Sequence, residues 1–169
     1  MKQNFYRARK LAVLTAVGTA VGVWLLTGTT GASNGQAAAI EHQFAGAETV
    51  VVAAARSVSA RWEENDYGDR IIVSRIELDV EETLKGAPTQ AMSLDVDGGT
   101  LDDLTLHVSG LHVMEPGERA VLFLNPGRDK VHTPHLRGQG ILVLDDQNIV
   151  KGRGLTLDDI RAKARGLGN

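Results

Sequence analysis

The chain has 169 residues, with 18 lysine and arginine residues against 21 aspartate and glutamate residues, a net charge of −3, and no cysteine. That length fits one domain, and a content of 43% hydrophobic and 23% charged residues is typical of a folded protein. The lack of cysteine excludes disulfide frameworks, thiol nucleophiles and thiolate metal sites. The negative net charge argues against a dedicated nucleic-acid-binding protein, since such proteins normally carry a basic surface.

The first 39 residues have the charge and hydropathy pattern of a secretory signal peptide. Four basic residues and no acidic one come before an apolar run at residues 11–26. Small residues then follow as far as three alanines at positions 37–39. Residues 1–39 are therefore predicted to be a signal peptide, with cleavage after Ala32 or Ala39.

An uncleaved N-terminal membrane anchor at residues 11–30 is the alternative. The 16-residue apolar run would span about 24 Å as a helix, less than the roughly 30 Å of a bilayer core, which favours cleavage. In both cases the basic residues precede the apolar segment, so the rest of the chain is expected to be exported, either periplasmic or secreted. Residues 40–48 are expected to be a linker to a single domain at residues 49–169.

A long hairpin is predicted at the start of that domain. Between residues 75 and 81, charged residues at odd positions alternate with apolar residues at even positions, as in a half-buried antiparallel strand. Residues 50–62 alternate similarly, except that Arg56 interrupts the apolar positions, which predicts a bulge. The polar residues 63–69 are predicted to be the turn between the two strands.

Further short strands and one helix are predicted downstream. Apolar runs at residues 104–108, 120–124 and 141–150 are separated by turns. Residues 156–165 predict a helix with Thr156 as its N-cap and Asp159 as the capping-box partner. The whole pattern predicts a mainly β fold, a small OB-like barrel of five to six antiparallel strands with the C-terminal helix packed outside. The largest candidates to fill its core are Trp62 and Phe123.

Two stretches carry a family resemblance. Residues 80–86 read VEETLKG, and residues 116–124 read PGERAVLFL. They resemble the V-E-E-x-L-K-G strand end and the P-G-E-x-x-x-x-F-L strand entry of netrin-like and tissue-metalloproteinase-inhibitor-like modules. In this order they are also similar to a group of exported bacterial β-barrel proteins. The resemblance covers residues 48–145 and implies an OB-like barrel. Those inhibitors chelate zinc with an N-terminal cysteine, which this chain lacks, so no inhibitory residue carries over.

The sequence offers few candidates for catalysis. His132 and His135 form an H-x-x-H spacing, and imidazole pairs can bind zinc, copper or nickel. They are weak metal candidates, because a structural site usually needs four ligands and only these two are close in sequence. The chain has no nucleophile elbow, zinc-protease motif, P-loop or dinucleotide motif, so no catalytic residue and no cofactor are predicted.

The preferred hypothesis is an exported, non-catalytic binding module that acts on an extracytoplasmic protein or envelope component. No nucleic-acid partner is expected, and contact with a membrane is expected only through an uncleaved N-terminal segment. The alternative is a small metal-dependent extracytoplasmic hydrolase that uses His132 and His135. The binding surface is expected at the barrel end where residues 63–69 meet the loops around 98–99 and 126–134. Tyrosine and tryptophan are enriched at interface hot spots. The predicted surface residues are Trp62, Glu63, Glu64 and Tyr67.

Overall fold

The computed structural model describes residues 31–65 and 67–167, and the fold is mainly β with two α-helices. The predicted anchor at residues 11–30, and most of the predicted signal peptide, lie outside these residues. Within the described part of the chain, no helix is both long and apolar enough to cross a membrane. The elements are α1 (Gly31–Gly46), β1 (Thr49–Glu64), β2 (Arg70–Lys85), β3 (Ala91–Asp97), β4 (Gly99–Leu101), β5 (Leu104–Leu106), β6 (Arg119–Pro126), η1 (Arg128–Lys130), β7 (His132–Pro134), η2 (Arg137–Gly140), β8 (Ile141–Val143) and α2 (Leu157–Leu167).

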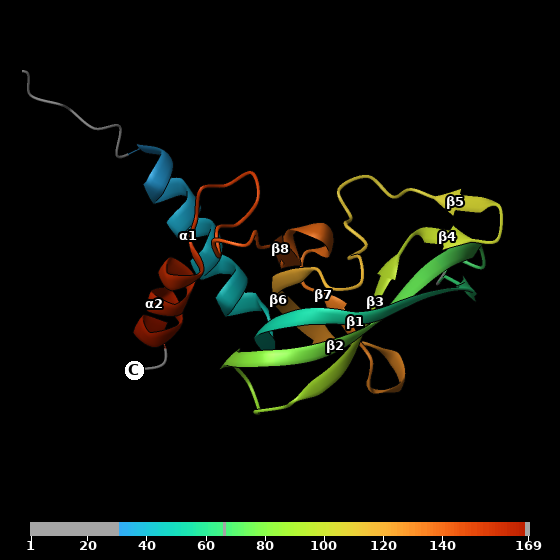
Figure 1. Ribbon diagram of the computed structural model, residues 1–169, viewed down its shortest axis with the longest axis horizontal. Helices are drawn as coiled ribbons and strands as arrows, with labels where there is room; N and C mark the ends of the chain where they lie inside the picture. The colour runs from blue at the N-terminus through green and yellow to red at the C-terminus, as the bar shows by residue number, and fades with distance from the viewer. Residues whose placement is uncertain (1–30, 66, 168–169) are drawn as a thin grey trace, which may run out of the picture. The chain divides into compact units, whose positions relative to one another are not determined.

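The main sheet has six strands in the order β1-β2-β3-β7-β6-β8, and β1 also pairs with β6 (Figure 1). These pairings bend the sheet into a ring, which confirms the mainly β prediction, although the ring is not a closed barrel. The predicted antiparallel order is wrong at one place, because β3 and β7 run parallel. Their pairing has one bridge, between Leu94 and His132.

The predicted hairpin and its bulge are confirmed. β1 and β2 pair antiparallel from Val50↔Lys85 to Glu64↔Arg70, with a register shift between Ala55 and Ser57. Arg56 is the residue left without a partner in the ladder, as expected for a charged residue that interrupts an apolar face. Its guanidinium instead forms an ion pair with Asp79 on the exposed side of β2.

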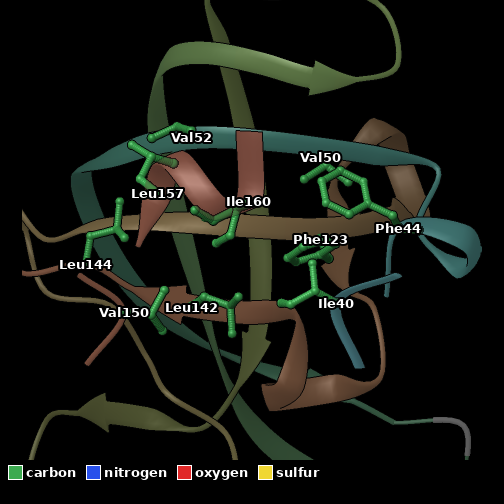
Figure 2. Packing of buried hydrophobic residues seen from close by; sticks show 12 residues of the cluster. Ile40, Phe44, Val50, Val52, Phe123, Leu142, Leu144, Val150, Leu157 and Ile160 are labelled. Atoms are coloured by element: carbon green, nitrogen blue, oxygen red, sulfur yellow. The ribbon is translucent and has the colours of Figure 1, made fainter. Parts of the chain in front are cut away.

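The first half of β1 is buried on both faces, whereas alternation had predicted one buried face. Val51 and Ala53 pack in the cluster inside the ring. Val50 and Val52 pack in the cluster that contains residues of both helices, as Figure 2 shows. The reason is that helices cover the outer face of the sheet at this end (Figure 1). Strands buried on both faces need continuous apolar runs rather than alternation.

Helix α1 occupies the segment predicted to be a linker, so residues 40–46 are part of the folded domain. Ile40 and Phe44 are both at most 3% exposed. The ring of Phe44 meets the ring of Phe123 edge to face, with centroids 5.1 Å apart. The Lys85 ammonium donates to the carbonyls of Phe44 and Ala47, both at 2.6 Å, and so caps the end of the helix.

Helix α2 begins as its sequence predicts. The Thr156 hydroxyl accepts a hydrogen bond from the Asp159 backbone N–H at 3.2 Å, and the Asp159 carboxylate accepts the Thr156 N–H at 3.0 Å. This is the reciprocal capping box. Leu157 and Ile160 then pack into the same cluster as Phe123, which places α2 outside the ring as expected (Figure 2).

Candidate functional site

A groove of about 720 Å³ lies at the turn end of the β1–β2 hairpin. One wall comes from the ends of β1, β2 and β3, and the other comes from the end of β6, from η1, β7 and the start of η2. Its apolar lining residues are Ile71, Val73, Leu106, Val108 and Pro126. Its polar and charged lining residues are Glu63, Glu64, Asn65, Tyr67, Asp95, Asp97, Arg128, Thr133 and Arg137. Of the segments predicted to gather at this end of the sheet, the groove is lined by residues 63–65 and 67 of the turn and by residues 126–128 and 133 of the later loop, whereas Gly98 and Gly99 do not line it.

An ion-pair network fixes the sheet wall of the groove. Arg75 donates two hydrogen bonds to the Asp95 carboxylate, at 3.0 and 2.8 Å, and Arg61 donates to it at 2.8 Å. Arg61 also donates through Nε to Glu63 at 2.7 Å. Burial of Asp95 opposes its ionisation, but the hydrogen bonds from Arg75 and Arg61 outweigh that effect and hold its pKa below the ordinary value.

The network balances two arginines with two carboxylates. Glu64 and Asp97 line the same groove and are exposed. Neither forms an ion pair with any residue in the ranges 31–65 and 67–167. The sheet wall therefore presents a local negative charge.

Tyr67 is the most exposed aromatic residue of the described chain, at 90%. Its backbone is nevertheless fixed, because the Asn65 side-chain oxygen accepts the N–H groups of Tyr67 and Asp69, both at 2.9 Å. Such an Asx turn presents the tyrosine ring from an ordered backbone. This arrangement lowers the entropy lost when the ring is covered by a partner.

Trp62 is separated from the other three predicted surface residues. Trp62 pairs with Ile72 and Glu63 pairs with Ile71, so these two side chains point to opposite faces of the strand, whereas Glu64 has the parity of Trp62 and lines the groove at the end of β1. Trp62 does not line the groove, and the Arg70 guanidinium lies 4.8 Å from the centre of its ring. At 41% exposed it does not fill the core either, so that part of the prediction is wrong for Trp62 and confirmed for Phe123, which is fully buried.

His132 and His135 do not converge on one point. His132 pairs with Leu94 of β3 and with Pro126 of β6, whereas His135 lies just past the end of β7 and its N–H donates to the Phe123 carbonyl of β6. The His135 ring approaches Asn125, with Nδ1 at 3.0 Å from the amide nitrogen. Over the described ranges, no group of three histidine, aspartate or glutamate side chains is arranged to hold a metal ion.

Arg61 and Arg75 were not predicted from the sequence to be site residues. Their shared partner Asp95 was visible only as one of two aspartates, with Asp97, on one face of a predicted strand. The register explains why: Arg75 faces Asp95 across the β2–β3 pairing, and Arg61 comes from the next strand. Charge alternation along β2 was visible, but the identity of the partner strand was not. Thr133 and Pro126 were predicted only as part of the loop at residues 126–134, not as individual site residues.

No family model matches this chain, and no curated protein matches it.

Proposed function

We propose that this protein is an exported, non-catalytic binding module whose interaction surface is the groove at the end of the β1–β2 hairpin. The observation that carries the proposal is Tyr67, which is 90% exposed on an ordered turn beside a groove with apolar lining. An exposed aromatic side chain next to apolar surface is a common feature of protein-binding hot spots.

The mixed lining favours a macromolecular partner. Apolar side chains such as Ile71 and Leu106 line the groove together with charged ones such as Glu64 and Arg137. Protein interfaces likewise combine apolar and polar side chains. The partner is an extracytoplasmic protein or envelope component, a proposal supported by the basic, apolar and small-residue order of residues 1–39.

Export is tested by mass spectrometry of the mature protein. We expect an N-terminus between Ser33 and Ile40. Intact Met1 in the membrane fraction would instead establish the N-terminal anchor.

Binding is tested with a photo-crosslinking amino acid placed at position 67. The matched control carries it at the exposed Gln90, on the β2–β3 loop outside the groove. In the envelope fraction, position 67 should give a defined adduct that position 90 does not give. With the captured partner, Tyr67→Ala should weaken binding by about 1 kcal/mol or more, roughly fivefold. Equal adducts from both positions would exclude the groove as the interaction surface.

A further inference from the structure

The second half of β1 has a free edge. On that side of β1, the contacts with β6 and the turn before it end in two hydrogen bonds at Ala55. The Ala55 N–H donates to the Glu118 carbonyl at 2.9 Å, and the Ala55 carbonyl accepts the Gly117 N–H at 2.7 Å. The Glu118 N–H donates to the Glu115 carbonyl at 2.9 Å, so the chain before β6 turns there. Residues 57–64 of β1 therefore pair with β2 alone.

The hydrogen bonds of the hairpin show which backbone groups face this edge. The Asn65 N–H donates to the Asp69 carbonyl at 2.9 Å, and such bonds recur at every second residue of an antiparallel pair. The Ile72 carbonyl, opposite Trp62, instead accepts the Gly98 N–H next to β3 at 2.7 Å, which agrees with this alternation. Beyond the bulge, the odd-numbered residues of β1 therefore bond to β2, and the even-numbered residues face outward.

The outward-facing backbone groups have no partner in the described chain. The N–H and carbonyl groups of Val58, Ala60 and Trp62 form no hydrogen bond with any residue in the ranges 31–65 and 67–167. Strands β4 and β5 form a separate two-stranded sheet, so they do not extend this edge (Figure 1). Ser57 and Ser59 are exposed along it, and Trp62 is 41% exposed. Such an edge is a template for another strand.

The sequence of this edge is complementary to itself. Two copies can pair antiparallel about a two-fold axis at Ala60, which places Ala60 opposite Ala60 and Val58 opposite Trp62. These residues all face outward, so each free N–H meets a free carbonyl of the second copy. On the other face Ser59 lies opposite Arg61, so no like charges face each other directly. An aromatic side chain opposite a β-branched one also stabilises a strand pair.

The neighbouring registers fit less well. An axis at Arg61 would place the two Arg61 side chains opposite each other, and like charges in that position destabilise a strand pair. An axis at Ser59 would pair Trp62 with Arg56, the bulge residue that has no partner in the ladder. The pairing centred on Ala60 spans residues 57–63, which fit between the bulge and the turn of the hairpin.

We propose that this protein forms a homodimer in which the free edges of two β1 strands pair antiparallel about Ala60. The two rings then share one continuous sheet, and the same surface of each copy forms the interface. This inference goes beyond the proposed binding function, because the partner is a second copy of the chain and the surface is the edge of β1.

Sedimentation equilibrium of the purified exported protein tests the dimer. We expect a mass of two chains that falls to one chain on dilution. A mass of one chain at every concentration would overturn the inference.

Single cysteines test the register, because the chain itself has no cysteine. Under mild oxidation Ala60→Cys should give a disulfide-linked dimer, since facing Cα atoms of a hydrogen-bonded pair lie about 5.5 Å apart, within the reach of a disulfide. The matched control Ser59→Cys should give about tenfold less, because its two copies are diagonal neighbours about 7–8 Å apart. Equal yields from the two variants would overturn the pairing about Ala60.

Two further substitutions test the edge by the dissociation constant of the dimer. Ala60→Pro removes the central outward N–H and no bond to β2, and Trp62→Ala removes two contacts with Val58 per dimer. We expect each to weaken the dimer about tenfold or more, with the fold of each variant verified by circular dichroism. The control Tyr67→Ala removes an exposed aromatic side chain outside the paired residues and should leave the dimer unchanged. A dimer unaffected by both Ala60→Pro and Trp62→Ala would overturn the inference.

Discussion

Truncation of Phe123 tests the central packing contact between the sheet and the helices. Phe123 is fully buried, and its ring contacts the ring of Phe44 in α1 edge to face. Phe123→Ala removes a buried aromatic side chain, which costs about 3–5 kcal/mol. That loss would take up much of the roughly 5–15 kcal/mol by which a domain of this size is stable. The free energy of unfolding is measured by urea denaturation followed by circular dichroism.

A double-mutant cycle isolates the ring contact itself. Phe44→Leu and Phe123→Leu nearly conserve volume, so each should cost about 1–1.5 kcal/mol without unfolding the protein. Because the two rings meet at 5.1 Å and 81°, the pair should show a coupling energy of about 0.5–1.5 kcal/mol. The measured quantity is the difference between the double variant and the sum of the single variants.

The control is a substitution at an exposed position outside the core. Gln90→Ala, at an exposed loop position, should change the free energy of unfolding by less than about 0.5 kcal/mol. Additive effects of Phe44→Leu and Phe123→Leu would contradict the edge-to-face contact between the two rings.

Three further predictions concern a glycine, a cap and a carboxylate. Gly99→Ala should lower the free energy of unfolding by about 2–5 kcal/mol, because its φ is +122° and a Cβ would lie 2.1 Å from the Ser74 hydroxyl. The control Gly68→Ala, whose Cβ would have no neighbour within 4 Å, should lower it by only about 1–2 kcal/mol. Thermal denaturation compares the two variants. Thr156→Ala removes the N-cap of α2 and should lower the free energy of unfolding by about 0.5–2 kcal/mol, with a matching loss of helical ellipticity. The Asp95 pKa is lowered in the folded state, so its stabilising effect is present above the unfolded value of about 4 and is lost as the pH falls through the folded value. Urea midpoints between pH 6 and pH 2.5 should therefore fall more steeply for the wild type than for Asp95→Asn, and parallel curves would contradict the network.

Features that depend on neighbouring residues in the sequence were predictable. The alternation along β2, the bulge at Arg56 and the capping box at Thr156 each involve side chains a few residues apart. Backbone geometry converts such short patterns directly into strand faces and helix ends. The hairpin turn and its exposed Tyr67 followed from the same local signals.

Features that depend on distant residues were decided by the tertiary structure. Helix α1 had no capping signal or apolar stripe strong enough to predict it, and it forms where Phe44 packs on Phe123. The position of Trp62 followed from the strand register at the turn, and His132 and His135 are separated because His132 lies in β7 whereas His135 lies past its end. The sequence contained Arg75 and Asp95, but only the register of β2 against β3 placed them opposite each other. Burial and pairing energies come from contacts between segments far apart in the chain, and local pattern carries no information about which segments meet.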